Sequence, residues 1–223
     1  MNGALGFLAE LLFPRRARCI GCGSIFGQER DDLCEACRKK LELSRVGVFQ
    51  TPADLRLSAA ICVYSYAGVG GSLVRALKYN STKILARQMG EEIAQACLKN
   101  LPDRMDYICF VPMQPDRERR RGFNQGELIA RAAAESLGVS CEPLLLRLHR
   151  TRRQVTLSDA QRRNNLKDAF GVKDGYDLRG KSVLLIDDVF TTGSTAKYCA
   201  KALRMAGAKQ IYFAAFAKGR NRS

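Results

Sequence analysis

The sequence predicts an α/β fold, in which helices flank a parallel β-sheet and a small cysteine-rich module precedes them. Short, continuously apolar segments alternate with helix-like segments between about residues 59 and 218. Uninterrupted apolar strands are typical of parallel sheets that helices cover on both faces. Two CxxC pairs lie within the first 45 residues, where helical and strand periodicity is weak.

Length and composition set the limits of this prediction. The chain has 223 residues and is 46% hydrophobic, which suits one domain plus a small module. We expect a module with an N-terminal helix over residues 1–45, a connector over 46–58 and the α/β domain over 59–223. The formal charge of +15 favours polyanionic partners, such as nucleic acid, phosphorylated small molecules or anionic lipid.

The first 13 residues are apolar, but a bilayer span needs about 20 such residues. They predict a short helix packed on the body of the protein, with a helix on a membrane surface as the alternative. No other segment is apolar enough to span a membrane, so we expect no transmembrane segment. The odd count of nine cysteines without a secretory signal fits a reducing compartment. We therefore expect a cytoplasmic protein, with the inner face of the membrane as an alternative location.

The first half of the domain begins with a strand over residues 59–66, which are rich in apolar residues. A helix follows over 70–79. A second helix over 84–98 has four apolar side chains spaced for one face: Leu85, Met89, Ile93 and Cys97. The apolar run over 107–111 predicts a strand that ends at Pro112.

The second half continues the alternation. Residues 124–137 predict a helix that Gly138 ends, and 143–148 a short strand. Residues 182–186 are a fully apolar strand. A helix over 195–206 and a last strand over 210–216 complete the domain. Since ligands bind beyond the carboxyl ends of parallel strands, the residues after Val111, Leu148 and Ile186 are the candidates for a site.

Two adjacent carboxylates, Asp187 and Asp188, follow the apolar strand over 182–186. Such carboxylates are costly unless a cation or hydroxyl groups meet them, and a ribose diol or a Mg²⁺-bound diphosphate would do so. A run of small residues then leads into the next helix: Thr191, Thr192, Gly193, Ser194 and Thr195. Its backbone N–H groups and the helix N-terminus suit a phosphate. The alternative is a plain turn with Thr192 or Ser194 as the helix cap.

This pattern of four aliphatic residues, Asp-Asp, a hydrophobe and TTGST resembles the phosphoribosyl pyrophosphate (PRPP) signature of type I phosphoribosyltransferases. The segments LVRALKY (73–79), RRRGFNQ (119–125) and RTRRQVTLSDAQRRNN (150–165), with the double CxxC, resemble the ComF family. These are competence-associated, phosphoribosyltransferase-like proteins linked to DNA uptake in natural transformation. The resemblance implies the type I phosphoribosyltransferase fold. It also implies that Asp187 and Asp188 face the ribose hydroxyls, and that residues 191–195 hold the 5′-phosphate.

The resemblance further implies a pyrophosphate loop over 112–117. Arginine forks suit phosphate oxygens, and four arginines lie in or beside this loop: Arg117, Arg119, Arg120 and Arg121. We expect PRPP contacts from Arg117, Arg121, Gln125 and Lys78, with Asn124 capping the next helix. The alternatives are a solvated basic turn and, for Lys78, a plain helix-end lysine.

The polar segment 150–165 lies where related enzymes carry a mobile hood that excludes water from the active site. We expect contacts to the substrate from Gln154, Thr156 and Arg162. A disordered surface loop is the alternative.

Four cysteines, Cys19, Cys22, Cys34 and Cys37, form two CxxC pairs separated by eleven residues. Each pair presents two thiolates, and two pairs complete a tetrahedral Zn²⁺ site. With four protein ligands the ion has no open position, so we expect a structural zinc ribbon. A redox pair is the alternative.

Two hypotheses for function result. The first is an enzyme or degenerate enzyme that binds PRPP with Mg²⁺ and displaces pyrophosphate, with Asp187 and Asp188 as catalytic residues. The acceptor would be an amine or a nucleobase, and such an active transferase would also suit nucleotide metabolism unrelated to DNA uptake. The second is an accessory protein that handles imported single-stranded DNA together with proteins of the competence machinery.

Overall fold

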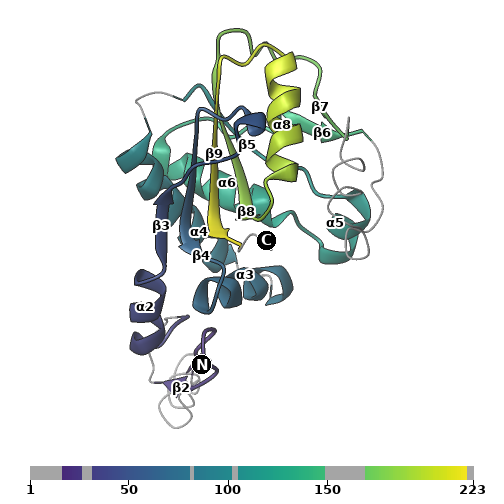
Figure 1. The fold of residues 1–223 in the computed structure, drawn as a ribbon. Helices are drawn as coiled ribbons and strands as arrows, with labels where there is room; N and C mark the ends of the chain where they lie inside the picture. The colour runs from purple at the N-terminus through teal and green to yellow at the C-terminus, as the bar shows by residue number, and fades with distance from the viewer. Residues whose placement is uncertain (1–16, 27–31, 81–82, 102–104, 149–168, 220–223) are drawn as a thin grey trace.

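The computed structural model describes residues 17–26, 32–80, 83–101, 105–148 and 169–219. At its centre is a five-stranded sheet with the strand order β3-β4-β9-β8-β5 (Figure 1). The strands are β3 (Arg45–Val48), β4 (Ala59–Ser65), β5 (Tyr107–Phe110), β8 (Ser182–Phe190) and β9 (Gln210–Lys218). β3 is antiparallel to β4, and the other three neighbouring pairs are parallel. The predicted α/β class is confirmed, with one antiparallel edge strand added.

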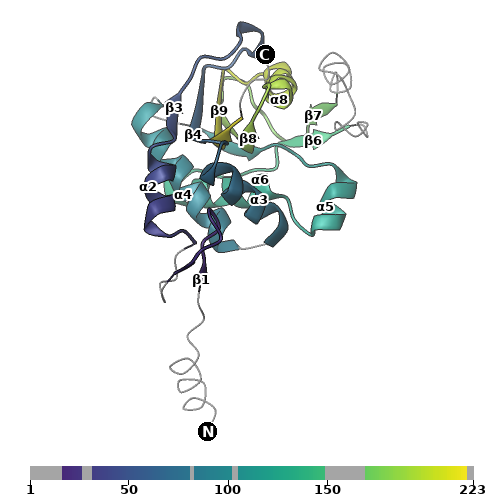
Figure 2. The same cartoon turned by 60° about the horizontal axis from the view of Figure 1, so that its bottom comes forward.

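Both faces of the sheet are covered (Figure 2). One face carries α3 (Val69–Asn80), α4 (Lys83–Asn100) and α6 (Gln125–Leu137). The other carries α8 (Ser194–Met205), the 3₁₀ turn η1 (Ala53–Leu55) and a hairpin of β6 (Leu145–Arg147) and β7 (Phe170–Val172). Since successive side chains of a strand point to opposite faces, Leu184 and Ile186 pack in the first core and Val183 and Leu185 in the second.

The N-terminal module consists of the antiparallel pair β1 (Ala17–Arg18) and β2 (Ile25–Phe26), followed by α2 (Glu35–Glu42). Leu33 and Leu41 belong to the same buried cluster as Leu73 of α3. The module is thus continuous with the core of the domain. β3 begins two residues after Leu43, the C-cap residue of α2. The segment expected as a connector, 46–58, contains most of β3 and all of η1.

Three single elements add detail to the expectation or differ from it. The short strand expected at 143–148 is present as β6, which pairs with β7 in a hairpin beside the central sheet. The pyrophosphate loop expected over 112–117 gives way at Pro115 to α5 (Pro115–Arg121), which carries Arg117, Arg119, Arg120 and Arg121 and has Pro115 at its first turn. β8 does not end at Ile186, because Val189 and Phe190 still pair with β9.

Several other local predictions were confirmed, whereas the helix predicted over the first 13 residues lies outside the described residues. Gly138 ends α6 with a positive φ of 64°, and the side chain of Asn124 caps the start of that helix. Four of the five single cysteines, Cys62, Cys97, Cys109 and Cys199, are buried free thiols. Within the part of the chain that the structure describes, every helix is too short or too polar to cross a membrane.

Candidate functional site

The two adjacent carboxylates lie near the carboxyl end of β8, where β5 no longer pairs with it. The pairing of β5 with β8 ends at Phe110 and Ile186, one residue before Asp187. Because side chains alternate along a strand, Asp188 points to the face that carries α3 and α6, and Asp187 to the face that carries α8. The edge where two parallel strands end therefore presents one carboxylate toward each layer of helices.

Asp188 is the better buried of the two and has two partners from distant parts of the chain. Its side chain is 7% exposed, and Lys78 Nζ lies 2.5 Å from its Oδ2 atom. Gln125 Nε2 donates to the same oxygen at 3.3 Å, and Arg121 in turn donates to Gln125. Two of the predicted site residues, Lys78 of α3 and Gln125 of α6, thus contact one carboxylate, and Arg121 of α5 is linked to it through Gln125.

Asp187 is partly buried, and its carboxylate accepts the backbone N–H of Asp188 at 2.8 Å. Burial raises the pKa of Asp187, and the neighbouring negative charge of Asp188 raises this pKa further. The backbone hydrogen bond and the Lys78 cation oppose this rise. A ligand that brings positive charge or hydroxyl donors would therefore stabilise the ionised Asp187 carboxylate.

The hydroxyl-rich run that follows forms the turn between β8 and α8. Gly193 is the N-cap residue of α8, with a φ of 76°, and as a glycine it has no side chain to cap the helix. The Thr192 and Ser194 hydroxyls lie 2.9 Å apart, and Thr192 Oγ1 accepts the Ser194 N–H at 3.4 Å. The remaining N–H groups of this helix start suit an anion, because they and the helix dipole favour negative charge.

A pocket of about 670 Å³ lies beside Asp188 and holds most of the predicted pyrophosphate contacts. Its lining residues are Lys78, Tyr79, Met113, Arg117, Arg120, Arg121 and Gln125. Arg119 does not line it, and pairs instead with Asp116 at 2.5 Å. The positive charge of this segment therefore converges on the pocket next to the Asp187–Asp188 edge.

The start of α6 sets the position of Gln125. Asn124 Oδ1 accepts the backbone N–H groups of Gly126 at 3.0 Å and Glu127 at 3.4 Å. Asn124 Nδ2 donates to the carbonyl of Val111 at 3.2 Å, which ties the helix to the end of β5. Asn124 is 5% exposed, so this cap is a buried anchor for the pocket wall.

Sequence reasoning missed two residues of the pocket wall, Tyr79 and Met113. Tyr79 was assigned only to the end of a helix, and Met113 carries no charge or hydroxyl group that points to phosphate binding. The predicted hood contacts, Gln154, Thr156 and Arg162, lie outside the described residues.

The four cysteines of the N-terminal module form the second candidate site. Their Sγ atoms all lie within 4.8 Å of one another, and those of Cys22 and Cys34 are 3.8 Å apart. Tetrahedral Zn–S bonds of about 2.3 Å place sulfurs about 3.8 Å apart, so the cluster fits a structural zinc ion. The Ser24 hydroxyl lowers the pKa of Cys22 to about 6, whereas burial raises that of Cys37 to about 12.

Comparison with protein families gives two matches. The phosphoribosyl transferase domain matches residues 124–223, which include Asn124, β8, the turn at Gly193 and α8. The double zinc ribbon domain matches residues 8–47, which include the four cysteines.

Three relatives match about two thirds or more of the chain. The DNA utilization protein YhgH of Salmonella typhimurium is 32% identical over 159 residues, which are 68% of this chain and 68% of that protein. Competence protein F of Haemophilus influenzae is 27% identical over 217 residues, or 87% of this chain and 93% of that protein. Competence protein ComFC of Bacillus subtilis is 25% identical over 199 residues, or 86% and 80%.

Two solved structures illustrate the similarity in three dimensions. Adenine phosphoribosyl transferase from Trypanosoma brucei is 11% identical, with a TM-score of 0.46, over 78% of this chain and 87% of that one. Glutamine PRPP amidotransferase from B. subtilis is 23% identical, with a TM-score of 0.39. That match covers 57% of this chain and 25% of the amidotransferase.

Proposed function

The chain belongs to the ComF family of phosphoribosyltransferase-like proteins with a zinc ribbon, and we propose that it binds PRPP at the carboxyl end of β8. The observation that carries this proposal is the Asp188 cluster. Lys78, Gln125 and the arginine pocket converge on a buried carboxylate that directly precedes a hydroxyl-rich helix start.

Each part of PRPP has a matching group of residues. The carboxylates of Asp187 and Asp188 suit the ribose hydroxyls as acceptors. The N–H groups and hydroxyls of the turn suit the 5′-phosphate, through Thr191, Thr192, Gly193, Ser194 and Thr195. The pocket suits the pyrophosphate, because Arg117 and Arg121 offer guanidinium forks beside Lys78.

Mg²⁺ is the cation that fits this arrangement. Carboxylate oxygens are ligands that Mg²⁺ accepts directly or through water, and Asp187 and Asp188 present two of them at one edge. When bound, the ion would neutralise charge on the pyrophosphate. The role left to the protein is to position the sugar and hold the leaving group, which is the main source of catalysis in such displacements.

In the transfer that we propose, the bond between the anomeric carbon and pyrophosphate breaks and a bond from an amine or nucleobase nitrogen forms there. The nucleophile loses one proton. The proposed acceptor of that proton is the Asp188 carboxylate, and pyrophosphate leaves with the electrons of the broken bond. Lys78 Nζ lies 2.5 Å from Asp188 Oδ2, so a move of Lys78 toward the pyrophosphate would leave this oxygen free to take the proton.

PRPP binding is tested by thermal unfolding and calorimetry with and without Mg²⁺. A ligand at about 100 times its Kd stabilises the folded state by about 2.7 kcal/mol, which raises the Tm of a chain this size by about 5–10 °C. The double variant Asp187→Asn with Asp188→Asn should lose this shift. The control Asp177→Asn, an exposed carboxylate paired with Arg179 at 2.8 Å, should keep it. A full shift in the double variant would rule out the site.

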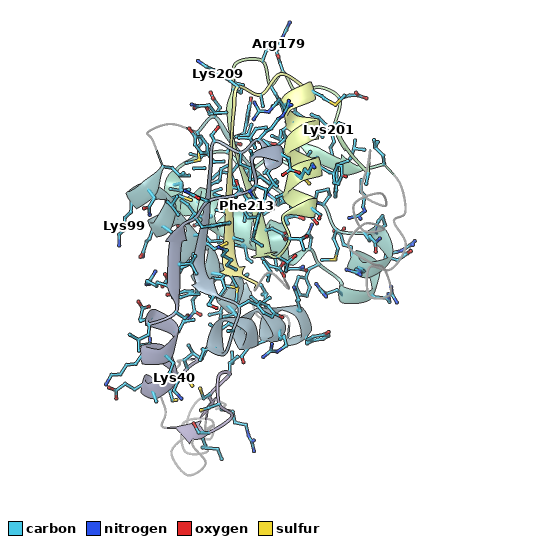
Figure 3. All side chains as sticks on the ribbon, viewed as in Figure 1. Lys40, Lys99, Arg179, Lys201, Lys209 and Phe213 are labelled. Carbon is cyan, nitrogen blue, oxygen red and sulfur yellow. The ribbon has the colours of Figure 1, made fainter. Side chains whose placement is uncertain are left out.

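A second candidate function is the handling of single-stranded DNA. The names of the relatives, a competence protein and a DNA utilization protein, favour it, as does the charge of +15. Exposed basic residues occur far apart, with Lys40 on α2 and Arg179 and Lys209 at the opposite end of the domain (Figure 3). That distribution favours many weak phosphate contacts over one deep site.

Fluorescence anisotropy with an oligothymidylate at several salt concentrations tests this function. Single-strand binding should weaken on a log–log plot with a slope of about −0.7 per phosphate neutralised. The absence of binding at low salt would exclude it as a direct activity, without bearing on PRPP.

A further inference from the structure

The segment between β3 and β4, residues 49–58, follows the zinc ribbon in the chain and lies against the turn that we propose to bind phosphate. This segment contains η1, and Leu55 at the end of η1 is 4% exposed. A Cβ atom placed on Gly193 would lie 2.7 Å from Leu55 Cδ2 and 2.8 Å from Phe190 Cζ. Leu55 therefore packs directly onto the N-cap residue of α8.

Two polar contacts fasten the same segment along α8. Asp54 and Lys197 form an ion pair at 2.5 Å, and Arg204 Nη2 donates to the carbonyl of Arg56 at 2.5 Å. Gly193, Lys197 and Arg204 are spaced by four and seven residues, so they share one stripe of the helix. The segment thus follows α8 from its N-cap residue to its last turn.

The backbone of this segment is itself constrained. Arg56 adopts a left-handed conformation with φ 51°, which an L-residue other than glycine seldom takes. Such a conformation persists when surrounding contacts fix it, and the bond from Arg204 to the Arg56 carbonyl is one such contact.

The other side of the turn is held by aromatic rings. Phe190, the last residue of β8, packs edge-on against Phe49 at 4.9 Å and against Phe213 at 5.4 Å between ring centroids. Phe213 lies in the middle of the molecule, on β9 (Figure 3). Gly193 therefore lies between the Phe190 ring, which the core holds in place, and the Leu55 side chain of the segment between β3 and β4.

We propose that Leu55 and the Asp54–Lys197 ion pair are positioning residues that hold the turn at Gly193 in its phosphate-binding shape. The inference rests on the proposed function of that turn. Its physical basis is that backbone N–H groups bind an anion well only when they are aligned in advance. The segment after the zinc ribbon would then determine the affinity for phosphate without touching the ligand.

The test compares Leu55→Ala with Leu178→Ala. Both leucines are buried in the same core cluster, but Leu178 precedes β8 and lies at the opposite end of that strand from Phe190. Calorimetry with PRPP and Mg²⁺, and with ribose 5-phosphate, should give a Kd about tenfold higher for Leu55→Ala and a change below about twofold for Leu178→Ala. Leu55→Met, which conserves volume, should restore the Kd.

Amide hydrogen exchange of Lys197, whose backbone N–H donates to the Gly193 carbonyl at 2.8 Å, tests the positioning role in the ligand-free protein. Exchange should be faster in Leu55→Ala than in Leu178→Ala, even when the two variants have lost the same amount in Tm. Asp54→Asn removes the ion pair with Lys197 and changes no core side chain, and its exchange should be moderately faster than in the wild type. Equal exchange in Leu55→Ala and Leu178→Ala would overturn the inference. A wild-type protein that binds neither phosphate compound would overturn the proposed function instead, while the exchange data would still decide the role of Leu55.

Discussion

The ion pair of Lys78 with Asp188 leads to a prediction in which the stability of the fold and the binding of PRPP are measured separately. Replacing Lys78 by Met removes the cation but keeps most of the side-chain volume. Asp188, whose side chain is 7% exposed, would then lose its cation and retain the hydrogen bond from Gln125 at 3.3 Å. Leaving a buried carboxylate without its cation is costly, because water cannot solvate it fully.

The cost follows from the burial of the pair. Removing one partner of a fully buried pair costs about 3–5 kcal/mol. The Lys78 side chain is 25% exposed, and Gln125 still donates to Asp188, so we expect about 2 kcal/mol. For a chain of this size that corresponds to a fall in Tm of about 4–8 °C.

The assay is a double-mutant cycle by urea unfolding. Lys78→Met should lose about 2 kcal/mol, whereas Lys78→Met combined with Asp188→Asn should recover to within about 1 kcal/mol of the wild type, because no unpaired charge remains. Both variants should fail to bind PRPP, since the proposed site needs both groups. If the two single substitutions are additive, the pair is not energetically coupled and the reasoning fails.

Three more predictions concern Asp187, Asn124 and Cys37. Because the pKa of Asp187 is raised, the folded protein binds more protons than the unfolded chain, so its stability should fall as pH rises from about 4 through the raised pKa. Asp187→Asn should remove this decline, measured as the urea midpoint against pH. An unchanged decline in the variant would contradict the assignment. Asn124→Ala should cost about 1–2 kcal/mol, because two N–H groups lose their cap; a loss below about 0.5 kcal/mol would contradict it. Cys37→Ser should reduce bound zinc from about one ion per chain and lower Tm, and native protein without zinc by metal analysis would refute the ribbon.

Strong local patterns made the central fold predictable. The apolar strands and the amphipathic α3, α4 and α6 have buried faces, so their hydrophobic periodicity reports their packing directly. α5 was missed because none of its residues is buried, and an exposed helix of seven residues carries no such periodicity. β3 was missed because a four-residue edge strand beside Pro52 has little pattern of its own.

The residue types of the candidate site were predictable from the sequence, but the contacts between them were not. The order of residues in β8 and the turn after it indicated a phosphate and a sugar, but not that Lys78 and Gln125 meet on Asp188. Those contacts join residues 110 and 63 positions apart along the chain, and only tertiary packing brings them together. The same holds for Leu55 against Gly193.

The position of the two carboxylates inside a paired strand has a consequence for how this segment can evolve. Asp187 pairs with Ala215 of β9, and the pairing continues to Phe190 and Lys218. A slip of one residue would move every side chain of β8 to the opposite face, which would turn Asp188 toward α8 and away from Lys78. The segment can therefore accept changes of residue far more readily than an insertion or a deletion, because its length fixes which carboxylate each layer of helices receives.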